Sequence, residues 1–377
     1  MQKVIFYPVG NGDTSQIILE NGRRILMDYR HLASSENDQG PEINLKARLK
    51  KELKDAGRNS FDVVALTHGD RDHIAGSTEF FELRHAAKYQ GGDRVQIAEL
   101  WVPAAMVLEE GTHDDRSAEF VLWRQEARHR LREGKGIRVF SKPDRLKGWL
   151  KDNGLSVDDR RHLITDAGQL VPGFDLDSDG VEFFCHSPFI KHVDDGDDLR
   201  NACALIFNVR FRVGGTTTDY LAVGDSDWSV LEDIVDATRT HGNMDRLRWD
   251  LFNIPHHCSY LALSDQKGKW ETEPKPDVEV LLLKGNSNAY LVSSSHPIED
   301  SDKGRAEVQP PHVQAKNCYE TYLNRLGGAR FLVTMGEPGT RKPEPIVFLI
   351  EAGGITIERT IFSSGSIATS SKPPRAG

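Results

Sequence analysis

The sequence predicts a layered α/β fold, and three observations support this prediction. Short apolar segments with the character of strands alternate along the chain with segments of helical period. Polar residues collect where several of the apolar runs end, which is where the ligand sites of layered α/β folds gather. The chain has 377 residues, of which 38% are hydrophobic, so it is long enough to bury a substantial core.

The first 65 or so residues predict hairpin strands, a helix and a buried strand. Turns of sequence GNGD and NG separate three apolar runs, which predict strands at residues 3–9, 14–20 and 23–28. A helix is expected over residues 44–57, because leucines recur there every four residues and a glycine ends the segment. The continuous apolar run FDVVALT, residues 61–67, is typical of a strand buried on both faces.

The rest of the chain predicts an insertion followed by a second set of strands and helices. Residues 101–175 are expected to form an insertion that carries helices, one of them at AEFVLWRQEARHRLREG. Helices are also expected at WSVLEDIVDAT and HVQAKNCYETYLNRL. The predicted strands are GVEFFCHSP, ACALIFNVRF, DYLAVGD, WDLFNIP, DVEVLLLKGN (277–286), ARFLVTM, PIVFLIE and GITIERTI. Residues 363–377 are small and polar and are expected to be disordered.

Composition excludes several classes of protein. No run approaches the roughly 20 apolar residues of a membrane helix, and the N-terminus lacks the features of a secretory signal, so a cytoplasmic protein without membrane contact is expected. The four cysteines have no paired spacing, which argues against a disulfide framework or a zinc knuckle. A net charge of −9 disfavours a protein that coats nucleic acid non-specifically, because such binding depends on Lys and Arg.

The stretch LTHGDRDHIAGS, residues 66–77, predicts a metal site. Four imidazole or carboxylate side chains fall within six positions of a loop at a strand end: His68, Asp70, Asp72 and His73. Zinc and manganese accept these ligand types, and a solvated polar loop would seldom have this composition.

Two further polar islands follow apolar runs and strengthen the metal interpretation. Asp225 ends the strand LAVGD, and His256 and His257 follow LFNIP. Taken alone, such an aspartate is more often a turn or helix-cap residue. Together with the first motif, these strand ends indicate one shared site, although sequence does not separate the two neighbouring histidines.

These motifs resemble a known family. HGDRDH is similar to the H-x-H-x-D-H signature of the metallo-β-lactamase fold, and Asp at the middle position is typical of its ComEC-like branch. The segments PVGNGDTSQIIL, RRILMD, RNACALIF, LAVGD, NIPHHCS and SSSHP also resemble segments of that branch, in the expected order from residue 9 to about 297. Three positions depart from the family, because Tyr29 and Arg30 stand where a small residue and Gly are usual, and Cys258 stands where Gly is usual.

The resemblance implies a four-layer αβ/βα metallo-β-lactamase sandwich over residues 1–362, with the helical insertion at about 101–175. It implies two divalent metal ions, with His68 and Asp70 on one, Asp72 and His73 on the other, Asp225 bridging, and His257 or His256 completing the second site. Such a pair would activate a bridging water. Asp70 in place of an imidazole shifts the preference toward manganese or magnesium, although zinc also accepts carboxylates.

Several residues are candidates for contact with substrate. Asp72 and His296 are the candidate catalytic residues, with His296 as a general acid or a phosphate contact and a turn histidine as its alternative. Asn201, Lys284 and Ser294 are candidates for holding a phosphate oxygen.

The function expected from these features is that of a metal-dependent phosphodiesterase, specifically a nuclease acting on nucleic acid or a nucleotide. The first alternative is a metallohydrolase of a small ester, thioester or lactone, because the fold hosts many reactions and the chain has no dominant basic stripe. The second alternative is a non-catalytic, metal-stabilised module that binds a protein partner in a bacterial defence or uptake system.

Overall fold

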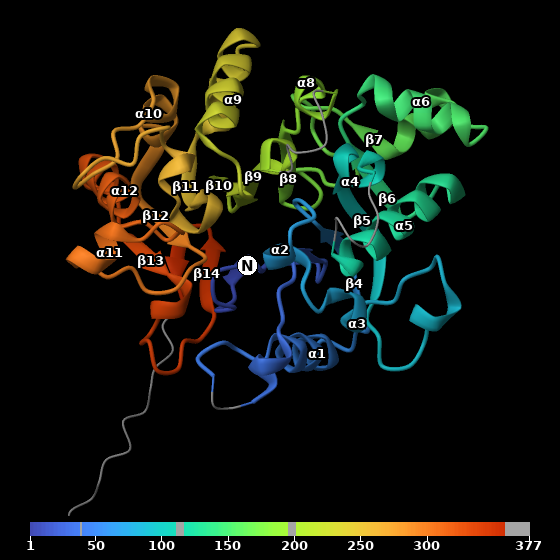
Figure 1. Ribbon diagram of the computed structural model, residues 1–377, viewed down its shortest axis with the longest axis horizontal. Coiled ribbons are helices and arrows are strands. Elements are labelled where there is room, and N and C mark those ends of the chain that lie inside the picture. The colour runs from blue at the N-terminus through green and yellow to red at the C-terminus, as the bar shows by residue number, and fades with distance from the viewer. Residues whose placement is uncertain (38–39, 111–116, 195–200, 359–377) are drawn as a thin grey trace, which may run out of the picture.

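The computed structural model describes residues 1–37, 40–110, 117–194 and 201–358. Two β-sheets lie face to face, and helices cover the outer face of each sheet, so that the molecule has four layers (Figure 1). The four-layer αβ/βα sandwich expected from the metallo-β-lactamase resemblance is confirmed by this architecture.

The first sheet has nine strands in the order β15-β14-β1-β2-β3-β4-β5-β6-β7. Pairing is antiparallel from β15 to β3 and parallel from β3 to β7. Its strands are β1 (Gln2–Phe6), β2 (Ser15–Ile18), β3 (Arg24–Met27), β4 (Ser60–Ala65), β5 (Gln96–Pro103), β6 (Ile137–Phe140), β7 (Ile164–Thr165), β14 (Ile346–Glu351) and β15 (Gly354–Ile357).

The second sheet has six strands in the order β13-β12-β11-β10-β9-β8. Pairing is antiparallel from β8 to β10 and parallel from β10 to β13. Its strands are β8 (Val181–Ser187), β9 (Ile206–Val213), β10 (Thr216–Val223), β11 (Trp249–Asn253), β12 (Gly285–Ser293) and β13 (Arg330–Val333).

The helices divide between the two outer faces. On the first sheet, α1 and α4 to α6 contribute buried side chains to one core, and on the second sheet α9, α10 and α12 contribute to another. The helices are α1 (Leu45–Asp55), α2 (Arg71–Ile74), α3 (Ser77–Phe80), α4 (Ala104–Leu108), α5 (Ala118–Glu133), α6 (Asp144–Asp152), α7 (Val157–Arg160), α8 (Ile190–Asp194), α9 (Trp228–Thr240), α10 (Pro276–Leu282), α11 (Asp302–Ala306) and α12 (Val313–Arg325).

A third core fills the space between the sheets. Trp101 from the first sheet packs edge-on against Phe183 of the second, with ring centroids 5.3 Å apart. In β4, Val63 faces this central core while Val64 faces the helices, because successive strand residues point to opposite faces. Burial on both faces explains why β4 has a continuous apolar sequence.

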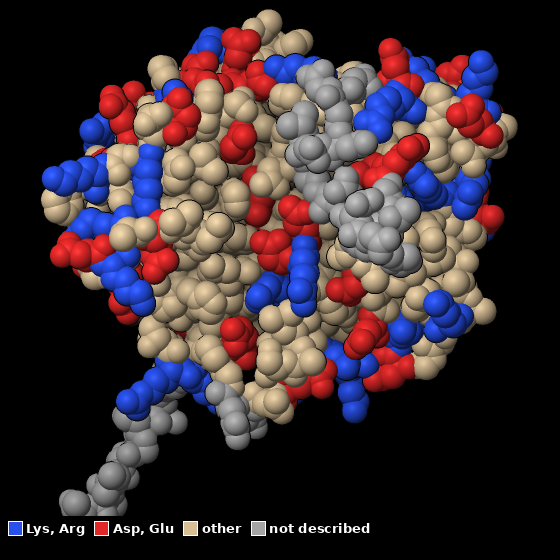
Figure 2. Space-filling view, viewed as in Figure 1, with Lys and Arg blue, Asp and Glu red and all other residues tan. Residues whose placement is uncertain are grey.

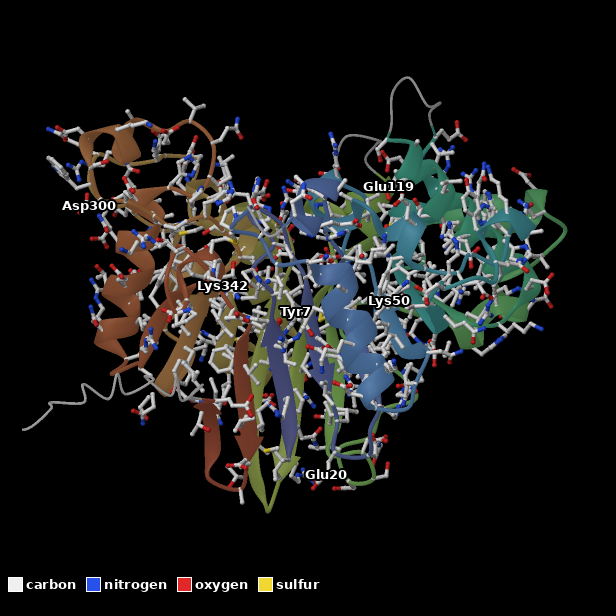
Figure 3. The ribbon with its side chains drawn as sticks, turned by 90° about the horizontal axis from the view of Figure 1, so that it is seen from below. Tyr7, Glu20, Lys50, Glu119, Asp300 and Lys342 are labelled. Atoms are coloured by element: carbon white, nitrogen blue, oxygen red, sulfur yellow. The ribbon has the colours of Figure 1, made fainter. Side chains whose placement is uncertain are left out.

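The strand directions place the carboxyl ends of β1, β3 and β4, and of β10 to β12, at one edge of the sandwich. Figure 3 shows the opposite edge at the bottom, where Glu20 lies at the turn between β2 and β3. The loops that follow the carboxyl ends hold the polar motifs of the sequence.

Two predicted segments differ from the structure. Residues 101–175 contain the expected helices, but they also contain β6 and β7, which extend the first sheet by parallel pairing. The strand predicted at residues 277–286 was wrong, because residues 276–282 form α10. Pro276 stands at its start, and its apolar side chains bury at helical spacing, at Val278, Leu281 and Leu282.

Over the described ranges, no helix is both long enough and apolar enough to cross a membrane. The tail predicted to be disordered, residues 363–377, lies outside the described residues.

Candidate metal centre

The motif at residues 68–73 forms a tight turn between β4 and α2. Asp70 occupies the residue before the single helical turn of α2, so His68 and His73 are carried back toward each other. Their rings lie 4.0 Å apart between centroids, and both are buried. Asp72 remains partly accessible, with 36% of its side chain exposed.

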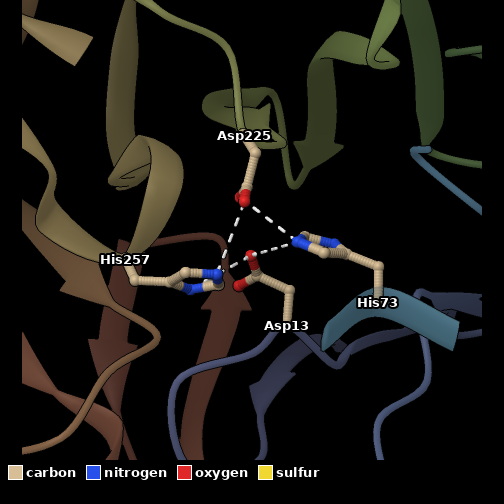
Figure 4. Close-up of side chains that lie close together, drawn as sticks. All are labelled: Asp13, His73, Asp225 and His257. Carbon is tan, nitrogen blue, oxygen red and sulfur yellow. Dashed lines mark ion pairs between the residues drawn. The ribbon is translucent and has the colours of Figure 1, made fainter. Parts of the chain in front are cut away.

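Four buried side chains from four segments of the chain, His73 in α2 and the others in loops or 3₁₀ turns, meet here (Figure 4). Asp225 Oδ1 lies 3.2 Å from His73 Nε2, and Asp225 Oδ2 lies 3.5 Å from His257 Nε2. Asp13 Oδ2 lies 3.8 Å from His73 Nε2 and 3.9 Å from His257 Nδ1. One ligand atom from each of these residues falls within 4.8 Å of all the others.

A second group shares His73 with the first. His68, Asp72 and His73 also have potential ligand atoms within 4.8 Å of one another. Asp72 Oδ2 lies 3.0 Å from His257 Nε2, and Asp70 Oδ2 lies 3.6 Å from His68 Nε2. The two groups are therefore continuous, as a site for two neighbouring cations requires.

The donor atoms at the centre of this arrangement fit a cation. His68 Nε2, His73 Nε2 and Asp225 Oδ1 are buried and make no hydrogen bond of good geometry, although His73 Nε2 and Asp225 Oδ1 lie 3.2 Å apart. Buried polar atoms are normally well paired, so three such atoms in one cluster need an explanation. Imidazole nitrogens and carboxylate oxygens are ligands of zinc and manganese, and cations bound among them would complete their bonding.

Neighbouring groups fix the orientation of the imidazoles. Asp28 Oδ2 lies 2.7 Å from His73 Nδ1, and the same carboxylate accepts hydrogen bonds from the backbone and the hydroxyl of Thr67. The backbone carbonyl of Ser294 lies 3.0 Å from His257 Nδ1. Such contacts aim the opposite nitrogen of each ring at the cluster, as they do in metal sites.

The electrostatics of the cluster favour positive charge at two of its imidazoles, His73 and His257, whereas burial and the neighbouring His73 lower the pKa of His68. Burial lowers the pKa of an imidazole, but Asp225 and the other carboxylates raise the pKa values of His73 and His257 well above the usual range. Burial opposes ionisation of Asp225, yet the two histidines hold its pKa well below the usual value. Burial raises the pKa of Asp13 to about 6 against the effect of the same histidines. A cation would bind in competition with these protons.

The segment after β11 has an unusual backbone. His256, His257 and Cys258 have φ values of 50°, 52° and 67°, a conformation that residues other than glycine rarely adopt. Cys258 adopts the backbone conformation that favours glycine, the residue usual at this position in the branch that the sequence resembles. The segment directs His257 into the cluster, whereas His256 is only half-buried and belongs to neither ligand group.

The structure brings most of the predicted metal residues together. Of the predicted substrate residues, some lie beside the metal-ligand cluster and others lie outside it. His68, Asp72, His73, Asp225 and His257 belong to the ligand groups, and Asp70 adjoins His68. Ser294 supports His257 through its backbone carbonyl, and its hydroxyl donates to Asn253 Oδ1. Asn201 lies beside the Asp225 loop, where its carbonyl accepts a hydrogen bond from Ser226 Oγ.

His296 and Lys284 lie outside the cluster. The backbone N–H of His296 donates to Asn11 Oδ1 in the β1–β2 loop at 2.8 Å. Lys284 precedes β12 and Ser294 follows it, so nine strand residues at roughly 3.3 Å each separate the two.

Sequence reasoning missed two carboxylates that the structure places at the cluster. Asp13 belongs to the turn GNGD, and its interpretation as a turn residue hid its position at the carboxyl end of β1. Asp28 ends β3 with a φ of 56° and contacts His73 from behind. Asp28 lies directly after β3, and this signal could have found it, whereas Asp13 lies late in the β1–β2 loop, two residues before β2.

Comparisons with known proteins give only distant likenesses. No family model matches the chain, and no curated protein matches it. Among solved structures, unliganded yeast PDE1 is 9% identical over 88% of this chain and 97% of that chain, at a TM-score of 0.43. The metallo-β-lactamase GOB-18 from Elizabethkingia meningoseptica is 14% identical over 85% and 86%, at 0.32.

A further solved structure, a diphosphatase from the PhnP family, is 12% identical over 83% of this chain and 95% of its own, at a TM-score of 0.29. Identities and TM-scores this low do not assign an activity, and the ComEC-like branch stays a prediction. The chemistry of the site therefore rests on the side chains themselves.

Proposed function

We propose that the protein is a metal-dependent phosphodiesterase, specifically a nuclease that acts on nucleic acid or a nucleotide. The observation that supports this proposal is the convergence of buried imidazoles and carboxylates with orphaned donor atoms at one edge of the sandwich. The two ligand groups consist only of His and Asp side chains, which in this proposal hold cations rather than attack the substrate.

Two divalent cations would be held by the residues of the two ligand groups together with Asp70, which adjoins His68. In this proposal His68 and Asp70 hold one cation, Asp72, His73 and His257 hold the other, and Asp225 lies between them. Asp13 is an added candidate ligand of the second. Such a pair of cations supplies a water activated for attack at neutral pH and a clamp on the oxygens of the group under attack.

The chain's own groups orient the metal ligands and favour particular cations and substrates. Asp28 and the Ser294 carbonyl hold His73 and His257 in the tautomers that leave Nε2 facing the cluster. The carboxylates among the donors favour manganese or magnesium and still accept zinc, and a hard, oxygen-rich site suits phosphate oxygens. We propose His296 as a group that contacts substrate, since it stands beside the β1–β2 loop at the edge of the site.

The test is metal analysis paired with a cleavage screen. The purified protein is expected to retain divalent metal by mass spectrometry. With manganese, it is expected to cleave plasmid, single-stranded DNA, RNA or bis(4-nitrophenyl) phosphate. Asp72→Ala and Asp225→Ala should abolish cleavage. Asp177→Ala should not, because this exposed residue pairs with Arg212 at the far end of β9.

Each alternative predicts a different result. Turnover of esters, thioesters or lactones without phosphodiester cleavage would replace the proposal with the small-ester hydrolase. Metal binding without turnover of any substrate, and loss of a protein complex in Asp72→Ala, would favour the non-catalytic module of a defence or uptake system.

We also propose a reducing compartment, the cytoplasm, as the setting of this activity. All four cysteines are buried and unpaired, as is usual where thiols stay reduced.

A further inference from the structure

An open pocket adjoins the candidate metal centre. It has a volume of about 380 Å³ and is lined by Arg30, Leu32, Arg71, Asp72 and Ala75. Because a water molecule occupies roughly 30 Å³ in the liquid, the pocket has room for a group of several heavy atoms with its hydration. Asp72 belongs to both the pocket and a metal-ligand group, so a molecule at the centre can extend into the pocket.

The glycines of the β1–β2 loop make room for the side chain of Arg30. A methyl group on Gly10 would lie 2.9 Å from Arg30 Nη1, and one on Gly12 would overlap the side-chain stem of Arg30. Arg30 Nη1 donates to the carbonyl of Val9, and the Arg30 backbone N–H donates to Thr14 Oγ1 at 3.0 Å. The guanidinium is thus half-buried and held in place before any ligand arrives, which lowers the entropy lost on binding.

Charges around Arg30 leave the pocket positive. The charged groups that face its guanidinium are Asp72, Glu42 and Arg71. Asp72 is engaged with His257 at 3.0 Å and, in the proposed function, with a cation. The guanidinium groups of Arg30 and Arg71 are then balanced by only one of these carboxylates, that of Glu42. Figure 2 shows acidic and basic side chains together near the middle of this face.

We infer that the pocket between Arg30 and Arg71 binds a second phosphate of the substrate, one that is not cleaved. This inference rests on the proposed function, because it places the cleaved phosphate at the metal centre. Guanidinium groups bind phosphate through paired hydrogen bonds, and two of them match a group that carries up to two negative charges. The family resemblance gives glycine at position 30, so this specificity belongs to the chain itself.

The second phosphate has two chemical sources: a neighbouring phosphodiester of a nucleic-acid strand, or a terminal phosphate. Chromogenic thymidine compounds separate them. The first pair carries a 4-nitrophenyl ester on the 5′-phosphate, and one member also has a 3′-phosphate. In the second pair the 4-nitrophenyl ester is on the 3′-phosphate, and one member also has a 5′-phosphate. A third set repeats both polarities with the extra terminal phosphate replaced by its methyl ester, which is a phosphodiester and so represents the neighbouring linkage of a strand.

The measured quantity is the ratio of kcat/KM for each compound with the extra phosphate to that of its partner without it. For the native protein with manganese, one polarity is expected to give a ratio of about ten or more, because a charged hydrogen bond contributes roughly 1.5–3 kcal/mol. In Arg30→Met and Arg71→Met the ratio should fall toward one, and in Arg30→Lys it should fall partway. Arg212→Met is the matched control and should keep the native ratio, since Arg212 lies at the far end of β9.

A binding measurement separates failure of this inference from failure of the proposed function. Calorimetric titration of the manganese-loaded protein should give at least tenfold tighter binding of thymidine 3′,5′-bisphosphate than of both thymidine monophosphates, and Arg71→Met should remove the difference. Because Arg71 is exposed, the Arg71→Met variant is expected to fold even if the Arg30→Met variant does not. Cleavage with ratios of one and equal affinities would overturn the inference while the function stands. Tighter binding of the bisphosphate without cleavage of any substrate would overturn the proposed function, while the assignment of the pocket as a phosphate site would stand.

Discussion

His256 and His257 are neighbours in sequence that occupy different surroundings. Three successive residues with positive φ turn the chain sharply after β11, and this turn buries His257 at the cluster while His256 stays half-buried outside it. Such a conformation costs free energy at non-glycine residues, and strain of this kind is found where function requires it.

This difference predicts opposite outcomes for the two alanine variants. His257→Ala should weaken binding of one metal ion by more than the roughly 10- to 100-fold typical of losing a supporting hydrogen bond. His256→Ala should retain the native metal content. Mass spectrometry after dialysis, with calorimetry for affinity, measures both, and metal loss in His256→Ala with retention in His257→Ala would reverse the assignment.

The metal-site residues were predictable to different degrees. His68, Asp72 and His73 were recognisable because four ligand-type residues crowd into six positions, and spacing of this kind is visible in sequence. Asp13 and Asp28 were not, because one aspartate after a glycine turn or a strand is also what an ordinary turn contains. Only the strand order and directions, which bring the carboxyl ends of β1 and β3 to the same edge of the sheet as that of β4, distinguish the two cases.

At the scale of elements, periodicity identified most strands and helices outside residues 96–175, with one clear error in the largely apolar run after Pro276. The run VEVLLL is compatible with either a buried strand or a helix. The structure makes it α10, and the following strand, β12, holds residues that had been read as the loop after it. Lys284 lies at the opposite end of β12 from Ser294, and β5, β6 and β7 were not predicted.

Helix α5 carries a buried charged network that fastens it to the first sheet. Glu126 Oε1 lies 2.6 Å from Arg130 Nε, and Glu126 Oε2 lies 2.9 Å from His85 Nδ1. Arg130 also donates to the carbonyl of Gly136, just before β6. Burial would raise the pKa of Glu126, but the bond to His85 and the charge of Arg130 lower it to about 2.

We expect Glu126→Gln to lower the free energy of unfolding by about 3 kcal/mol, because Arg130 would remain buried without its countercharge. Since the folded pKa is depressed, the stabilisation by Glu126 is fully present above the unfolded value near 4.5. It is lost as the pH falls toward about 2. Urea denaturation at pH 7 and pH 3 measures both effects. The difference between native protein and variant should be smaller at pH 3.

Glu133→Gln is the matched control on the same helix, because Glu133 is exposed. It should change the free energy of unfolding by less than about 0.5 kcal/mol. An equally small effect of Glu126→Gln at pH 7 would show that the buried pair contributes little to the stability of α5.

At the scale of the whole molecule, the candidate metal centre joins the two halves of the sandwich. Asp13 and His73 come from loops of the first sheet, and Asp225 and His257 come from loops of the second (Figure 4). Without cations, the carboxylates of the cluster repel one another and depend on protonated histidines for countercharge. Bound cations would therefore strengthen the contact between the halves as well as supply chemistry.

Metal removal should accordingly lower the melting temperature of the whole domain. A ligand at 100 times its dissociation constant stabilises the folded state by about 2.7 kcal/mol, which corresponds to a rise of a few degrees in a domain this large. Calorimetric melts in excess manganese and in excess chelator measure the difference. Asp225→Ala should abolish it, because Asp225 contacts both His73 and His257, whereas Asp177→Ala should preserve it. Equal melting temperatures of the native protein in manganese and in chelator would mean that no bound cation contributes to the stability of the cluster.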